Sequence, residues 1–183
     1  MHLLEECISS EEKFSGRVFK VRLDKVKLEN GKTASREVVH HNGGVCILPL
    51  TAENEVIFVK QFRYPYMETV LELPAGKLEI GEDHAEAGKR ELLEETGCTC
   101  KKYTFLGKLY PSPGYVDEII YLYLAEDLEY SQQSLDEDEF LDIVKIPFDK
   151  AIEMVMANEI PDSKSQVCLF KTYMMKEKKG SID

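Results

Sequence analysis

The segment Gly76–Cys98, GKLEIGEDHAEAGKRELLEETGC, gathers acidic side chains along one stretch with helical spacing. At about 100° per residue, Glu91, Glu94 and Glu95 share one face of the predicted helix. Like charges at these spacings repel each other unless a positive group lies between them. Carboxylate oxygens gathered in this way suit a hard divalent cation such as Mg²⁺, which prefers carboxylates together with substrate phosphates. The segment therefore predicts a metal site.

Two more charged residues belong to the same pattern. Arg90 adjoins the acidic face, and Glu82 precedes the helix where a loop can bring it back. A glutamate-rich helix can also be a solvated surface, and composition alone does not exclude this alternative. The fixed order G-x5-E-x7-R-E-L-x-E-E-x-G is much more specific than composition. We therefore favour the metal site over the solvated surface.

This order of residues resembles the Nudix box, the signature of a family of diphosphate hydrolases. The matching positions are Gly76, Glu82, Arg90, Glu91, Leu92, Glu94, Glu95 and Gly97. Cys98 departs from the pattern, because the family usually has Ile, Leu or Val there. A small side chain that is readily buried should be tolerated at this position. The resemblance implies cleavage of a nucleoside diphosphate linked to another group.

Length and composition restrict the remaining possibilities. The chain has 183 residues, which suits one domain or one domain with an appendage. Its net charge of −11 argues against a broad surface for nucleic acid or anionic membranes. No apolar run approaches the ~20 residues that span a bilayer, and the acidic start does not resemble a signal peptide. Five scattered cysteines indicate reduced thiols, so we expect a cytoplasmic protein.

The residues before the box predict an N-terminal ribbon. Residues 16–28 alternate between apolar and polar, with a change of parity after Leu23 that suggests a bulge. Asn30-Gly31 is a hairpin signal, and residues 33–41 provide the returning strand. A two-stranded ribbon is marginal alone, so it must dock on the main body or on a partner subunit.

Strands and helices are mixed along the rest of the chain. We expect the box helix to begin near Asp83 and to end at Gly97, and we expect a mobile acidic loop over residues 126–139. The other predicted strands are 45–50, 56–62, 66–73 (at a sheet edge), 103–109, 118–124 and 143–146, and the other predicted helices are 149–157 and 163–176. This order predicts an α/β (α+β) fold, a helix–sheet–helix sandwich. With the resemblance, it becomes a Nudix α/β/α sandwich with a mixed sheet and an N-terminal antiparallel β-ribbon.

Three further segments resemble the ADP-ribose pyrophosphatase branch of the family. They are residues 15–44, 56–79 and 110–125, and the last is followed by the acidic sequence DEDEF. The resemblance implies Mg²⁺-dependent hydrolysis of ADP-ribose to AMP and ribose 5-phosphate, with Mn²⁺ as a possible substitute. It also implies a homodimer in which residues 1–42 form a dimerisation and substrate-binding arm and residues 43–183 form the hydrolase domain. No nucleic-acid or membrane partner is expected.

Other functions stay open from the sequence. Another substrate, such as GDP-mannose, ADP-glucose or NADH, would use the same box. A non-catalytic, nucleotide-sensing domain is the alternative from a different class of protein. It is disfavoured because the chain keeps all four box glutamates and has no spare length for a DNA-binding module. The base and sugar preference and the number of metal ions are not readable from the sequence.

The resemblance assigns roles around the metal. Glu91 and Glu95 would be direct carboxylate ligands, Glu94 would support them, and Glu82 would bind through water or a further metal ion. The backbone carbonyl of Ala75 would also be a ligand. Arg90 would orient the glutamates as their ion-pair partner without binding the metal itself.

The resemblance also implies residues for the substrate. Arg36 and Arg63 would bind the diphosphate, because guanidinium groups recognise such oxygens through paired hydrogen bonds. The alternative for both is an ion pair within the protein. Phe19 is our preferred stacking partner for the base, ahead of Phe14, Tyr64 and Tyr66.

A general base must lie within hydrogen-bond reach of the attacking water. In the resembling enzymes it is a glutamate on a loop after the last core strands. Glu139 is our choice and Glu137 the second, whereas the alternative is an acidic loop that is merely solvated. Glu118 is a candidate for a further water or metal contact, and a structural role for it is an equal alternative.

Overall fold

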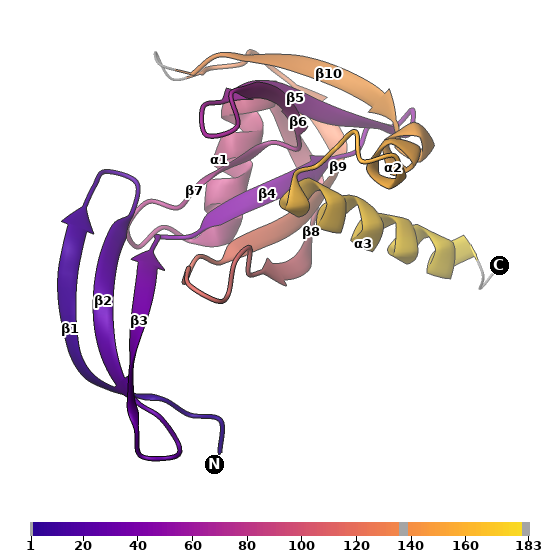
Figure 1. Cartoon of the computed structure of the whole chain (residues 1–183). Coiled ribbons are helices and arrows are strands. Elements are labelled where there is room, and N and C mark those ends of the chain that lie inside the picture. Colours follow the sequence, from indigo (N-terminus) through magenta and orange to yellow (C-terminus); the bar gives the residue numbers. More distant parts are fainter. Residues whose placement is uncertain (1, 136–138, 181–183) are drawn as a thin grey trace. The chain divides into compact units, whose positions relative to one another are not determined.

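A computed structural model describes residues 2–135 and 139–180 of the chain. The chain divides into two compact units (Figure 1). The first unit contains Met1–Gly43 and Tyr110–Ile119, and the second contains Gly44–Leu109 and Ile120–Asp183. No helix in the described ranges is long and apolar enough to cross a membrane.

The first unit is built on a three-stranded antiparallel sheet in the order β1-β2-β3. Its strands are β1 (Glu6–Ser15), β2 (Lys20–Lys27) and β3 (Thr33–His40). The predicted hairpin between β2 and β3 is confirmed, and Gly31 has the positive φ of 78° that a tight turn requires. The strand β1 was not predicted, because its sequence ECISSEEKFS lacks apolar alternation and every residue in it is exposed.

The predicted bulge after Leu23 is wrong. Pairing between β2 and β3 is continuous from Lys20 to Lys27. The register shifts lie instead in the pairing of β1 with β2, between Cys7 and Ser9 and between Glu12 and Phe14. The change of parity on β2 is therefore not caused by an extra residue in that strand.

The second unit contains a four-stranded mixed sheet in the order β7-β4-β9-β8. Its strands are β4 (Gly44–Pro49), β7 (Ala75–Lys77), β8 (Cys98–Leu109) and β9 (Ile120–Tyr130), and only the β4–β9 pair is parallel. Helix α1 (His84–Thr96) packs on β4, β7 and β8, whereas α3 (Ser163–Gly180) packs on β4, β8 and β9. Figure 1 shows the two helices on opposite sides of the sheet.

Alternate residues of β4 explain why both faces of the sheet are covered. Val45 and Ile47 belong to the core that contains α1 residues, and Cys46 and Leu48 belong to the core that contains α3 residues. All four are essentially inaccessible to solvent, which is typical of a strand buried on both faces. The predicted helix–sheet–helix sandwich is therefore confirmed.

A second sheet of three antiparallel strands has the order β10-β5-β6. Its strands are β5 (Glu55–Arg63), β6 (Glu68–Glu72) and β10 (Leu141–Pro147), and helix α2 (Phe148–Met156) packs beside β5 and β10. The predicted edge strand after the proline at position 65 is confirmed as β6.

The predicted loop over residues 126–139 is wrong in its first part. Residues 126–130 continue β9, in register with β8 as far as the pair Cys98–Tyr130. Lysines on β8 form ion pairs across the strands, Lys102 with Glu126 and Lys101 with Glu129. Opposite charges on facing strands stabilise such a pair, so the acidic residues fit a strand here. Residues 131–135 have no regular structure.

Candidate active site

The helix that carries the acidic residues has well-defined ends. The side chain of Asp83 accepts hydrogen bonds from the backbone N–H groups of Ala85 and Glu86, which caps the N-terminus of α1. Gly97 ends the helix in the left-handed conformation, with φ of 68°. The predicted start and end of this helix are both confirmed. Cys98, which departs from the pattern of the box, is fully buried, as the sequence suggested.

At two glycines of the segment, a larger residue would force a neighbouring side chain to move. A Cβ on Gly88 would lie 2.0 Å from the hydroxyl oxygen of Tyr103 on β8, so this position in the helix must stay small. A Cβ on Gly76 would lie 1.8 Å from Oε1 of Glu91. Glycine at position 76 therefore lets the Glu91 carboxylate reach the backbone of β7.

The Glu95 carboxylate also lies against β7. Its Oε2 accepts a hydrogen bond of 3.0 Å from the backbone N–H of Ala75. Glu91 and Glu95 are buried, with 9% and 2% of their surface exposed. The strand and the helix thus bring together Ala75 and the two predicted direct ligands.

Arg90 forms ion pairs with three glutamates at once. Its Nε lies 3.0 Å from Glu82 Oε1, and its Nη1 lies 2.9 Å from both Glu91 Oε1 and Glu94 Oε2. These contacts raise the pKa of Arg90, and the hydrogen bond from Arg90 lowers the pKa of Glu82. We call Glu82, Glu91, Glu94, Glu95 and Arg90 together the acidic cluster.

One arginine does not balance the four glutamates of the acidic cluster. Burial raises the pKa of Glu95 to about 8, and the charges of Glu91 and Glu139 add to this against the hydrogen bond from Ala75. Burial also raises the pKa of Glu91, although Arg90 opposes the shift. For both carboxylates, the positive charge nearby does not offset the effect of burial.

The carboxylates of the acidic cluster fit a divalent cation by their chemistry. Their oxygen atoms suit a hard ion such as Mg²⁺, and one arginine leaves part of their negative charge uncompensated. In the residues that the structure describes, no three acidic, histidine or cysteine side chains converge into a preformed metal-binding group. Arg90 instead holds three of the carboxylates.

The chain after β9 runs along the end of α1. Ser134 donates its backbone N–H to the Glu94 carbonyl at 3.1 Å, and Gln133 donates from Nε2 to the Glu95 carbonyl at 2.5 Å. Farther along, the charge of Glu139 adds to burial in raising the pKa of Glu95. The predicted base is therefore electrostatically coupled to the acidic cluster. The second choice, Glu137, lies outside the described residues.

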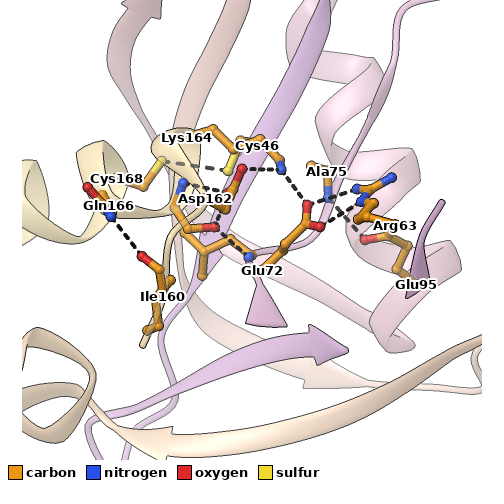
Figure 2. A network of polar contacts seen from close by, with 12 residues as sticks. Cys46, Arg63, Glu72, Ala75, Glu95, Ile160, Asp162, Lys164, Gln166 and Cys168 are labelled. Atoms are coloured by element: carbon orange, nitrogen blue, oxygen red, sulfur yellow. Dashed lines mark hydrogen bonds and ion pairs between the residues drawn. The ribbon is translucent and has the colours of Figure 1, made fainter. Parts of the chain in front are cut away.

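Arg63 is held by a glutamate that the sequence did not single out. Arg63 Nε and Nη2 donate to the two carboxylate oxygens of Glu72 at 2.6 and 2.8 Å (Figure 2). Lys164 binds the same carboxylate and also Asp162. The ion-pair alternative thus holds for one edge of the Arg63 guanidinium. Glu72 has only apolar neighbours in VLELP, which is a signal for a buried charge that needs a partner.

The other predicted substrate residues belong to the first unit. Arg36 forms a two-point ion pair with Glu5, so its guanidinium also has a partner within the protein. Phe19 precedes β2 and is 42% exposed. Glu118 Oε1 lies 3.3 Å from Nδ1 of His41.

Comparison with protein families gives two matches that together cover most of the chain. The family model described as NUDIX domain matches residues 40–167. The model described as nucleoside diphosphate sugar hydrolase N-terminal domain matches residues 5–39. The boundary between the two matches falls at the end of β3.

Similar proteins carry different names. An ADP-ribose pyrophosphatase of Bacillus subtilis is 44% identical, and 89% of each chain is covered. A methanol dehydrogenase activator of Bacillus methanolicus is 42% identical, and 90% of each chain is covered. A GDP-mannose pyrophosphatase of an Enterobacter species is 33% identical, over 73% of this chain and 75% of the relative.

A solved structure supports the fold. The crystal structure described as an ADP compounds hydrolase superposes with a TM-score of 0.88 and covers 98% of both chains. The two sequences are 24% identical, so this likeness concerns the architecture.

Proposed function

The chain belongs to the NUDIX domain family as a pyrophosphatase of the class that hydrolyses nucleoside diphosphate sugars, and we propose that its substrate is ADP-ribose and its cofactor Mg²⁺. The products would be AMP and ribose 5-phosphate. The observation that carries this proposal is the acidic cluster, in which Glu91 and Glu95 lie against β7 with uncompensated charge. ADP-ribose is favoured over other nucleoside diphosphate sugars because the Bacillus subtilis relative named ADP-ribose pyrophosphatase is 44% identical.

The proposed chemistry follows from the residues of the second unit. Glu91, Glu95 and the Ala75 carbonyl would hold Mg²⁺, with Glu94 and Glu82 in support. The ion would supply neutralisation of charge on the phosphoryl oxygens. Arg90 orients the glutamates through its contacts with three of them.

Two residues would act on the reactants themselves. Arg63 would bind the diphosphate with the part of its guanidinium that Glu72 does not use. Glu139 would accept the proton of the attacking water. Burial is the main cause of the raised pKa of Glu91 and Glu95, and the charge of Glu139 adds to both shifts; this coupling supports the role.

We also propose a homodimer formed through the first unit, which would contribute Arg36, Phe19 and Glu118 to substrate binding. All ten residues of β1 are exposed, among them the apolar Ile8 and Phe14. Removal of residues 1–40 should yield a monomer without activity, measured by sedimentation and by AMP release. An active monomer would refute the shared arm.

A substrate panel tests the proposed activity. Hydrolysis of ADP-ribose, ADP-glucose, GDP-mannose and NADH would be followed by chromatography of AMP and GMP, with Mg²⁺ and with a chelator. We expect kcat/KM for ADP-ribose to exceed the others by about tenfold, or roughly 1.4 kcal/mol in transition-state stabilisation. A flat panel, or GDP-mannose ahead, would overturn ADP-ribose as the substrate. Undiminished turnover with the chelator would overturn the metal requirement.

A further inference from the structure

Four charged side chains form a second cluster next to the acidic cluster. Arg63 on β5 and Glu72 at the end of β6 form a two-point ion pair at 2.6 and 2.8 Å. Lys164 on α3 binds Glu72 and lies 2.9 Å from Asp162. Figure 2 shows these four residues in one continuous network, which we call the balanced network because it has two positive and two negative groups.

The balanced network is tied to the backbone that leads into the metal site. Asp162 Oδ2 accepts hydrogen bonds from the backbone N–H of Ser165 at 3.0 Å and from its hydroxyl at 2.5 Å. The Ser165 hydroxyl oxygen in turn accepts from the Leu73 backbone N–H at 2.8 Å. Ala75, two residues later, donates to Glu95 (Figure 2). The first turn of α3 therefore fixes both Glu72 and the chain entering β7.

Glu72 uses one edge of the Arg63 guanidinium. Glu72 takes Nε and Nη2, whereas Nη1 donates no hydrogen bond within residues 2–135 and 139–180. The Arg63 side chain is 40% exposed, but those of Glu72 and Lys164 are only 4% and 13% exposed. The network thus has a buried base and an accessible arginine at its outer end.

We propose that Lys164 is a positioning residue for the diphosphate-binding site and acts through Glu72 on Arg63. This inference rests on the proposed function, in which Arg63 binds the substrate diphosphate. Without the lysine, Glu72 and Asp162 would leave one negative charge uncompensated behind Arg63. That charge would weaken the attraction of Arg63 for an anion, and Glu72 would lose one of the two groups that fix it.

The test compares Lys164→Met with the wild-type protein at saturating Mg²⁺. We expect KM for ADP-ribose to rise by roughly five- to tenfold while kcat changes by less than about twofold, as for a lost binding interaction. The matched control is Lys171→Met, because Lys171 lies on the same helix but donates to the Leu106 carbonyl at 2.7 Å, away from the network. An unchanged KM in Lys164→Met would overturn the proposal, even if the variant melts at a lower temperature.

A double variant separates charge from packing. Lys164→Met with Asp162→Asn restores the balance of charges, and Asn keeps an oxygen that can cap α3. We expect this variant to recover most of the wild-type KM. The double variant also tests the proposal if Lys164→Met alone does not fold. A KM that stays raised in the double variant would contradict a role through charge.

The Arg63 side chain gives a readout that does not depend on turnover. Its Nε–Hε resonance in ¹⁵N spectra of the metal-free protein can be assigned by its loss in Arg63→Lys. We expect this resonance to shift in Lys164→Met and to stay in place in Lys171→Met. If the wild-type protein hydrolyses nothing in the panel, the proposed function fails, but the Arg63 resonance still decides whether Lys164 positions Arg63. An unshifted resonance would overturn the inference.

Discussion

The acidic cluster and the balanced network contain two glutamates that are equally buried but have opposite pKa shifts. Glu95 is 2% exposed and Glu72 is 3% exposed. Burial raises the pKa of Glu95 to about 8. Burial also opposes ionisation of Glu72, but the hydrogen bond from Arg63 and the charge of Lys164 outweigh it and lower the pKa of Glu72.

The two side chains are exposed to a similar extent but have different partners. Glu72 has a cation on each side, whereas the N–H of Ala75 is the single hydrogen-bond donor to the Glu95 side chain within the described residues. A balanced buried network needs no further group to stay ionised. The acidic cluster has four carboxylates and one arginine, so a divalent cation would complete it. This asymmetry distinguishes a site for a ligand from a structural ion-pair network.

The largest expected effect comes from Glu95→Gln, which removes a proposed metal ligand. Because metal binding contributes several kcal/mol to charge stabilisation in the transition state, we expect kcat to fall on the order of 10³-fold. Circular dichroism should show an intact fold. The matched control is Glu86→Gln, an exposed glutamate on the same helix that pairs with Lys89. Wild-type activity in Glu95→Gln would exclude this metal site.

The next effect is expected from Glu139→Gln, which removes the proposed base but no proposed metal ligand. General base catalysis contributes about 10²-fold or more, so kcat should fall by about that factor with little change in KM. Glu129→Gln is the control, because Glu129 lies on β9 and pairs with Lys101. A retained kcat would assign the base to Glu137 or to another residue.

Glu72→Gln tests the balanced network through stability. The variant leaves Arg63 and Lys164 without their shared partner, and breaking a buried pair is costly. We expect the free energy of unfolding to fall by about 2–3 kcal/mol at pH 7, less than for a fully buried pair because Arg63 is partly exposed. Urea titration gives this value, and a stability equal to the wild type would contradict the network.

The smallest expected effect is a difference in how the stability of wild type and variants depends on pH, measured in the presence of a chelator. The raised pKa of Glu95 means that its contribution to stability is fully present below about pH 4.5 and is lost as the pH rises through about 8. The wild-type melting temperature should therefore fall relative to Glu95→Gln between pH 5 and pH 9. The lowered pKa of Glu72 has the opposite sign, so the stability gap between wild type and Glu72→Gln should shrink as the pH falls below 4.5. Parallel melting curves for all three proteins would contradict the comparison.

Local signals in the sequence predicted the elements that position the site. The cap at Asp83 and the glycine at position 97 gave the limits of α1, because both act on the backbone nearest to them. The strand β1 and the last part of β9 were missed because their residues are polar or acidic. Their pairing depends on neighbouring strands, and the ion pairs from β8 are not visible in the local pattern.

The sequence by itself determined the acidic face of α1, the two glycines that frame it and the family to which these residues point. It determined them because spacing along one helix and conformational freedom at one residue are local properties. Only the tertiary structure decided that Lys164 supports Glu72, a residue 92 positions away. The packing of α3 brings these two charges together; the apolar neighbours of Glu72 in the sequence signal that it needs a partner but do not identify Lys164. The same holds for Gly88, whose small size is required by Tyr103 on a different element.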